Sequence, residues 1–218
     1  MERNLTSGVL TWGRAFVLLG LLSLATSCAT SRSTAEAATS TRSGFDVTDF
    51  GANGSDEEDN TAAFNAAIAA ATPKHGQVNV PPGVYIISDQ LNLDTGVSLV
   101  GAGMQRTRLQ VALKGGTKQI ANLLSVSEGS SNVVIADLEI AAGGHVENVI
   151  RSTGGTSNLR VQRCWIHHAM RGIEVDRASG QFLDNLIHDM SQGGVGIGFS
   201  HESRFIEMGV TGPPLSAR

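Results

Sequence analysis

The chain has 218 residues with 16 Lys and Arg against 20 Asp and Glu, and its net charge of −4 argues against a nucleic-acid partner, which needs a basic patch or stripe. Hydrophobic residues make up 41% of the chain, enough for a core, which argues against a wholly disordered protein. The 26 Gly residues and the 5% of aromatic residues suit short strands joined by tight turns.

Residues 1–27 have the layout of a secretory signal peptide. Arg3 and Arg14 precede an apolar run that is too short to span a membrane as a helix, which needs about 20 residues. The run ends at Cys28 in a sequence that resembles the lipobox of bacterial lipoproteins. This resemblance implies an acylated Cys28 and an exported protein, anchored at the outer membrane or cell surface. The alternative is an ordinary signal peptide cut near residues 25–27.

Residues 28–43 are rich in Ser, Thr and Ala without an apolar period, which predicts a disordered tether. If Cys28 carries lipid, Cys164 is the only other cysteine and no intrachain disulfide can form. Cys164 lies between apolar positions, and this favours a small buried side chain over a reactive thiol.

The folded part begins near Gly44. Residues 45–52 alternate between apolar and polar side chains and predict a strand that ends at Gly51. The acidic residues 55–61 suit the N-terminus of a helix, with Asp59 or Asn60 as the capping residue, although they could instead bind a cation. An apolar stripe at helical spacing follows, made of Phe64, Ala67, Ile68 and Ala71. We expect this helix to cover the N-terminal end of the fold, whose strand edges would otherwise be exposed.

The segment from residue 121 to residue 199 repeats. An offset of 26 residues aligns residues 123–132 with residues 149–158 and pairs Ile135 with Val161 and Ile140 with Ile166. An offset of 21 residues then pairs Val161 with Phe182, Ile166 with Ile187, His167 with His188 and Gly172 with Gly193. Repeats of 20–50 residues indicate a solenoid. No unit contains a useful helical stripe or the L-x-x-L-x-L frame of leucine-rich repeats, so the pattern predicts an all-β, parallel β-helix.

This β-helix is expected over residues 44–205, with residues 206–218 as an irregular tail. The tail completes no further turn, and we expect a chain truncated at its C-terminus.

Four blocks, residues 46–52, 59–64, 80–85 and 99–103, resemble in order and spacing the N-terminal signature of the pectate-lyase superfamily. That group includes rhamnogalacturonase-like proteins and mannuronan C5-epimerases. The resemblance implies a single-stranded, right-handed parallel β-helix and a polysaccharide partner. It does not fix one reaction, because one fold hosts many chemistries.

The resemblance also guides the search for catalytic residues. Lyases of this fold class use Ca²⁺ on carboxylates with a basic residue, and hydrolases use two or three carboxylates. Epimerase relatives carry a Tyr-Gly-Phe-Asp-Pro-His block. The matching stretch here, residues 171–176, keeps the glycine but lacks the Tyr, the Asp-Pro pair and the His. We therefore expect no epimerase activity by that mechanism.

A polar cluster on neighbouring turns is the remaining candidate site. His167 and His188 occupy the same place in successive units and should stack about 5 Å apart. The candidate catalytic residues are His167, His188, Asp176 and Arg171, and the candidate substrate-binding residues are Trp165, His168, Glu174 and Asp189. Trp165 should face outward, where its ring could stack on a sugar. The alternative is that these side chains are only a solvated outer face.

No metal ligand is assigned, although Asp137 and Glu139 could add a cation site and Ca²⁺ is the cofactor that the resemblance allows. The chain is thus expected to be a polysaccharide lyase or a glycoside hydrolase. The alternatives are a non-catalytic β-helix that binds polysaccharide or has a structural role, and an inactive truncated member of the family.

Overall fold

The computed structural model describes residues 44–113, 119–197 and 204–211. The predicted signal peptide, tether and lipidated Cys28 lie outside these residues. The described elements are β1 (Phe45–Asp46), η1 (Val47–Phe50), β2 (Ser55–Asp59), α1 (Thr61–Ala71), η2 (Thr72–Lys74), β3 (Gln77–Val80), β4 (Gly83–Ile87), β5 (Leu91–Leu93), β6 (Ser98–Gly101), β7 (Thr107–Val111), β8 (Ile120–Val126), β9 (Val134–Ala136), β10 (Glu139–Ala141), β11 (Val146–Ser152), β12 (Leu159–Gln162), β13 (Trp165–Val175), β14 (Ser179–Ile197) and β15 (Arg204–Thr211).

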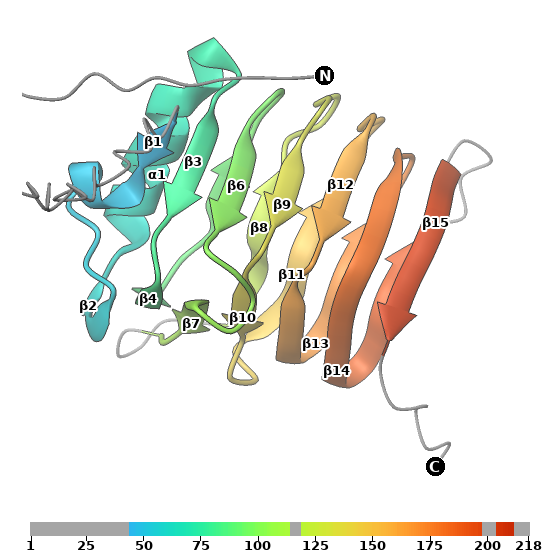
Figure 1. The fold of residues 1–218 in the computed structure, drawn as a ribbon. Coiled ribbons are helices and arrows are strands. Elements are labelled where there is room, and N and C mark those ends of the chain that lie inside the picture. The colour runs from blue at the N-terminus through green and yellow to red at the C-terminus, as the bar shows by residue number, and fades with distance from the viewer. Residues whose placement is uncertain (1–43, 114–118, 198–203, 212–218) are drawn as a thin grey trace, which may run out of the picture. The chain divides into compact units, whose positions relative to one another are not determined.

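The strands of successive turns stack in parallel, as Figure 1 shows. Inward-facing apolar side chains lie over one another in three columns. These columns are Val78, Leu99, Ile135, Val161 and Phe182; Tyr85, Leu109, Ile140, Ile166 and Ile187; and Leu91, Leu124, Ile150, Ile173 and Val195. A fully buried side chain of this size contributes about 1.5–3 kcal/mol, so the columns hold the turns together. The predicted parallel β-helix is confirmed.

The register agrees with the two sequence offsets up to one point. Val161 pairs with Ile135 and with Phe182, and His167 pairs with His188, as predicted. The predicted pairing of Gly172 with Gly193 is wrong. A register shift lies between Ala169 and Arg171, so Arg171 pairs with Gly193 instead.

Strand β13 has two halves that pair with different strands. In its first half, Trp165–Ala169, residues 165–167 pair with β10 on one side, and the half pairs with β14 on the other side. Its second half, Arg171–Val175, pairs with β11. The long strand β14 follows the same path and pairs with β12 before it pairs with β13. The polar residues of the two halves therefore lie beside different neighbouring strands.

Single residues in the left-handed conformation recur at equivalent places in successive turns. Three groups share this feature: Asn132 and Asn158; Asp137, Arg163 and Asp184; and His168 and Asp189, all with φ between 51° and 59°. Asn, Asp and His are the non-glycine residues that adopt this conformation most readily. Such residues turn the chain from one sheet to the next within a very short distance.

The N-terminal part differs from its predicted strand. Strand β1 has only two residues and is followed by η1, because the Asp46 side chain accepts a hydrogen bond from the Thr48 N–H at 3.0 Å. Gly51 ends η1 at φ 93°, a conformation that glycine adopts without strain. The acidic segment expected to cap the helix also forms strand β2, which pairs with β4.

Helix α1 begins and buries the side chains as predicted. Asp59 accepts a hydrogen bond from the Thr61 N–H at 3.0 Å, whereas the Asn60 side chain bonds elsewhere. The predicted stripe, Phe64, Ala67, Ile68 and Ala71, is buried in the core. Figure 1 places the helix beside β1 and β3, and its role as a cover for the first turn stays a prediction. Among the described residues, no helix has the length and hydrophobicity to cross a membrane.

Glycine is required where the turn after β6 meets the next turn of the chain. A Cβ atom on Gly101 would collide with the carbonyl oxygen of Asp137. The Gly103 N–H donates to that same oxygen at 3.0 Å. One of the blocks that carries the family resemblance thus serves close packing.

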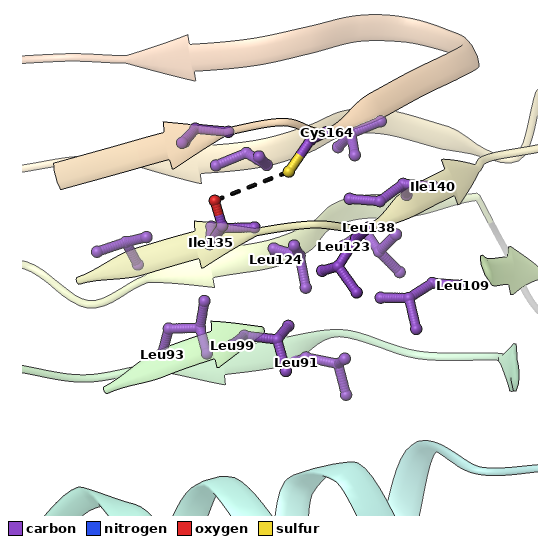
Figure 2. Close-up of a cluster of buried hydrophobic side chains, with 14 of the residues drawn as sticks. Leu91, Leu93, Leu99, Leu109, Leu123, Leu124, Ile135, Leu138, Ile140 and Cys164 are labelled. Carbon is purple, nitrogen blue, oxygen red and sulfur yellow. Dashed lines mark hydrogen bonds between the residues drawn. The ribbon is translucent and has the colours of Figure 1, made fainter. Parts of the chain in front are cut away.

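Cys164 is fully buried, as predicted. Figure 2 shows its sulfur among Leu and Ile side chains, pointing toward the Ile135 carbonyl oxygen at 3.7 Å. Burial raises the pKa of the Cys164 thiol to about 12, because the apolar surroundings disfavour the thiolate. The thiol is therefore a core side chain rather than a nucleophile.

The irregular tail was predicted to begin at residue 206, but part of that segment forms a strand. Strand β15 pairs with β14 as far as Thr211, so regular structure continues past residue 205.

Candidate functional site

The candidate site lies on the outward side of β7, β10, the first half of β13 and the facing part of β14. Side chains on this side form two columns along the stacked strands. One column holds Arg108, Glu139, Trp165 and Leu186, and the other holds Gln110, Ala141, His167 and His188. The columns bring together residues that are up to 80 positions apart in the sequence, as the numbers of Arg108 and His188 show (188 − 108 = 80). We call Glu139, Trp165, His167, His168, His188 and Asp189 the histidine cluster.

The two predicted histidines do stack. The rings of His167 and His188 lie 5.5 Å apart between centroids and are inclined by only 5°. The Trp165 ring lies against both, with centroid distances of 5.1 Å to His167 and 6.0 Å to His188. Trp165 is half-buried between the fully buried Cys164 and Ile166, so it faces outward as predicted.

His188 is held through both ring nitrogens. The Trp165 indole N–H donates to His188 Nε2 at 2.6 Å, and His188 Nδ1 lies 2.7 Å from Asp189 Oδ2. An indole N–H can only donate, so Nε2 is the acceptor and Nδ1 carries the proton given to Asp189. This arrangement fixes the ring orientation of His188 and occupies both of its nitrogens.

His167 is held from the opposite side by a buried carboxylate. His167 Nε2 lies 3.0 Å from Glu139 Oε1, and Arg108 Nη2 lies 2.6 Å from the same oxygen. The Glu139 and His167 side chains are only 6% and 11% exposed. The hydrogen bond to Glu139 raises the pKa of the Arg108 guanidinium, with partial desolvation opposing it. Glu139 is therefore paired with a permanent cation and oriented toward His167.

His168 differs from its two neighbours because it projects outward. It lies at a corner with φ 59°, and its side chain is 58% exposed. Its Nδ1 lies 2.6 Å from His167 Nδ1, whereas its Nε2 is 3.8 Å from Asp189 Oδ2, too far for a hydrogen bond. Of the three histidines, His168 alone has a ring nitrogen without a hydrogen bond among the described residues.

The structure does not bring the other predicted residues into this cluster. Arg171, Glu174 and Asp176 belong to the second half of β13 and the turn after it. Each has a charged partner there: Arg171 with Glu147 at 2.9 Å, Glu174 with Arg151 at 3.3 Å and Asp176 with Arg177 at 3.7 Å. The cluster thus keeps five of the eight predicted site residues, namely Trp165, His167, His168, His188 and Asp189.

The two carboxylates proposed as a cation site are already engaged. Arg163 donates to both oxygens of Asp137, at 2.7 Å each, and Glu139 is bound by Arg108 and His167. In the described part of the chain, no three His, Cys, Asp or Glu side chains are arranged to hold a metal ion. These residues do not fit a Ca²⁺ site, which takes six to eight oxygen ligands.

Sequence reasoning missed the role of Glu139 as a histidine partner, and missed Arg108 entirely. The 26-residue offset does align Glu139 with Trp165, and this alignment could have placed it in the cluster. Arg108 pairs with Glu139 at a spacing of 31 residues (139 − 108), which matches neither offset. No sequence signal marked it.

Comparison with known proteins gives the family. The family model of rhamnogalacturonase A/epimerase, pectate lyase-like proteins matches residues 44–210. The chain is 33% identical over 124 residues to the mannuronan C5-epimerase AlgE3 of Azotobacter vinelandii, a match that covers 52% of this chain and 7% of the epimerase.

Two solved structures are similar in fold. The A-module of the mannuronan C5-epimerase AlgE4 of Azotobacter vinelandii has a TM-score of 0.58 and 20% identity, over 77% of this chain and 58% of the module. The catalytic unit of a thermostable α-1,3-glucanase from Streptomyces thermodiastaticus has a TM-score of 0.55 and 20% identity, over 74% of this chain and 34% of that one. Both similarities support the predicted β-helix fold, and this chain spans less than two thirds of each relative.

The match to the family model covers most of the chain and agrees with the resemblance seen in the sequence blocks. The chain belongs to the rhamnogalacturonase A/epimerase, pectate lyase-like family of β-helix proteins.

Proposed function

We propose that this chain acts on a polysaccharide that lies along the outward side of β7, β10, β13 and β14, with the histidine cluster as its acid–base site. One observation carries the proposal: three histidines and a tryptophan from two successive turns meet on one outward side. Histidine transfers protons near neutral pH, and a half-exposed indole ring offers an apolar surface to a sugar. The names of the similar proteins, epimerases of mannuronan and an α-1,3-glucanase, also support a polysaccharide.

The charges of the cluster favour lyase-like chemistry over glycoside hydrolysis. A hydrolase needs two carboxyl groups at the scissile bond. Glu139 is buried and held by Arg108 and His167, which leaves Asp189 as the exposed carboxylate of the cluster. In a lyase, a base takes the proton from C5 of a uronate, the C–H electron pair forms the C4–C5 double bond, and the C4 oxygen leaves and takes a proton from water.

The test is to incubate the purified chain with mannuronan, pectate, β-1,3-glucan and α-1,3-glucan, with and without Ca²⁺. A lyase gives an unsaturated product that absorbs in the ultraviolet, and reducing ends without this absorbance would point to a hydrolase and contradict the lyase assignment. Replacing Trp165 with Ala should weaken polymer binding at least tenfold. Gln181→Ala, in the part of β14 that pairs with β12, is the matched control and should bind as the wild type does.

Binding without catalysis is the second candidate, and one observation favours it. Both ring nitrogens of His167 and of His188 are already engaged in hydrogen bonds. If no polymer is cleaved, but polymer binding is observed and is lost in Trp165→Ala, the chain is a binding protein. If His167→Ala with His188→Ala leaves binding unchanged, the polymer does not bind at this site.

We further propose that the chain is exported and anchored to the bacterial cell envelope by a lipid on Cys28. The apolar run before Cys28 and the lipobox-like residues at its end support this. In cells fed radioactive palmitate, the wild type and Cys164→Ala should both carry label and sediment with membranes. Cys28→Ala should carry none, and a labelled Cys28→Ala chain would rule out this anchor.

A further inference from the structure

We propose that Nε2 of His168 is the proton acceptor of the site, and that Glu139 and His167 position it by fixing which nitrogen of each ring carries a hydrogen. The inference rests on the proposed function only for the substrate: the base acts on the polymer bound at the histidine cluster. The sequence predicted a substrate-binding role for His168, whereas the hydrogen bonds of the cluster give it the role of the base.

The buried end of the cluster sets the first hydrogen-bond direction. Arg108 cannot give up its proton in a protein, so it donates to Glu139 Oε1, at 2.6 Å. The carboxyl oxygen that takes a hydrogen bond from Arg108 is an acceptor, because a guanidinium can only donate. The nitrogen that meets the same oxygen at 3.0 Å, His167 Nε2, must therefore carry a hydrogen and donate it.

The hydrogen bond between His167 and His168 sets the second direction. A neutral imidazole with its hydrogen on Nε2 has a lone pair on Nδ1. His167 Nδ1 and His168 Nδ1 lie 2.6 Å apart, so one of the two must donate to the other. Because His167 Nδ1 is the acceptor, His168 carries its hydrogen on Nδ1. This leaves the lone pair of His168 on Nε2, on a side chain that is 58% exposed.

Hydrogen bonds also exclude His167 and His188 as the proton acceptor. The Trp165 indole N–H donates a hydrogen bond to His188 Nε2, and Asp189 accepts a hydrogen bond from His188 Nδ1. His167 is almost fully buried and uses both nitrogens. His188 therefore holds Trp165 and Asp189 in place, while His168 is the histidine left with an open lone pair.

The path of the proton is balanced. His168 Nε2 takes a proton from the sugar, and the electron pair of the broken bond stays on the sugar. The hydrogen on His168 Nδ1 can then pass to His167 Nδ1. His167 becomes the imidazolium, with its Nε2 hydrogen still facing the Glu139 carboxylate. One proton has been gained, and its positive charge has moved next to a buried negative charge, which is the favourable place for it.

The decisive experiment measures which nitrogen of each histidine carries a hydrogen, by long-range proton–nitrogen NMR on the full-length chain labelled with ¹⁵N-histidine. We expect His167 with its hydrogen on Nε2, and His168 and His188 with theirs on Nδ1. Single substitutions assign the signals. A native His168 with its hydrogen on Nε2 would overturn the inference.

A variant sharpens the test. His167→Phe keeps a ring of similar shape but removes the acceptor, so His168 should shift to the form with its hydrogen on Nε2. The rate on the responsive polymer should fall about 100-fold with little change in KM, because binding contacts remain. His145→Gln, which replaces an exposed histidine outside the cluster, should change neither readout. Unchanged His168 hydrogens in a folded His167→Phe chain would contradict the positioning role.

The two proposals fail in different ways. If no polymer is turned over but the hydrogens lie as expected, the proposed function is wrong and the positioning of His168 stands. If a polymer is turned over and His168 carries its hydrogen on Nε2, the function stands and this inference is overturned.

Discussion

The two halves of strand β13 use polar side chains in opposite ways. In the first half, His167 is almost fully buried, and a sequence of hydrogen bonds from Arg108 through Glu139 leads to His168 in the solvent. In the second half, Arg171 and Glu174 each pair with one opposite charge from β11 and remain partly exposed. The first half ends at His168, which has a ring nitrogen that can still accept a hydrogen bond. In the second half, each charged side chain is paired with a charged neighbour. Only the first arrangement leaves a group that can react.

The backbone explains part of this difference. The left-handed residue His168 turns its side chain away from the sheet, as Asp189 does in the next turn. The pairing of β13 with β14 shifts register between Ala169 and Arg171, and the second half pairs with β11 on its other side. A corner and a register shift within one strand thus separate a reactive cluster from a set of ion pairs.

The largest expected effect is on catalysis. His168→Gln should lower the turnover of the responsive polymer at least 100-fold, because it removes the proton acceptor without emptying a core position. Glu147→Gln breaks the ion pair of Arg171 in the second half and should change turnover less than threefold. Circular dichroism would establish that both variants are folded. Equal losses in the two variants would show that the halves do not differ in function.

The second effect is on stability at high pH. It concerns the buried side chain of Cys164, the residue just before the first half of β13. The pKa of Cys164 is raised from 9.0 to about 12, so above pH 9 the unfolded chain loses a proton that the folded chain keeps. The free energy of unfolding should therefore fall by about 1.4 kcal/mol per pH unit between pH 9 and pH 12 through this group alone.

The measurement is urea unfolding from pH 8 to pH 11. Cys164→Ala should be less stable than the wild type at pH 8 because it leaves a small cavity, but it should lack this part of the slope. The difference between the two slopes isolates the thiol from Lys and Tyr ionisation, and parallel slopes would contradict the burial of Cys164.

The third effect tests whether the buried carboxylate of Glu139 contributes more to the free energy of unfolding than a more exposed one does. Glu139→Gln keeps the side-chain shape but removes the charge that Arg108 and His167 face, so it should cost about 1–3 kcal/mol of unfolding free energy. Glu174→Gln in the second half should cost less than about 1 kcal/mol, since its pair with Arg151 is partly screened by water. Chemical unfolding of both variants gives the comparison, and a smaller cost for Glu139→Gln would reverse it.

The fold could be predicted from the sequence because a β-helix repeats. Equal units put Val161 over Ile135 and His167 under His188, and a simple offset finds such pairs. The offset failed at Gly172 because a register shift adds a residue to one strand only, and a periodic reading does not detect this. The short β1 was missed because a local hydrogen bond, from Thr48 to Asp46, overrides the alternating pattern.

The candidate site was predictable only in part. Stacking of His167 and His188 follows from register, but the direction of each hydrogen bond depends on Glu139, Arg108 and the corner at His168. The turn between Arg108 and Glu139 is longer than the repeat, so no alignment brings these two residues together. Ion pairs such as Arg171 with Glu147 depend on rotamers, which a sequence pattern does not contain.

The smallest expected effect measures the ion pairs themselves. A double-mutant cycle on Arg151 and Glu174, with each residue changed to Gln alone and then together, should give a coupling of about 0.2–1 kcal/mol. This coupling should fall in 1 M salt, where the screening length is about 3 Å. The same cycle on Arg108 and Glu139 should give a larger coupling that salt changes less, because the Glu139 carboxylate is shielded from water. Equal couplings with equal salt dependence would mean that burial does not distinguish the ion pair beside the first half of β13 from the ion pair of its second half. The choice of His168 as the reactive group would then rest on hydrogen-bond direction alone.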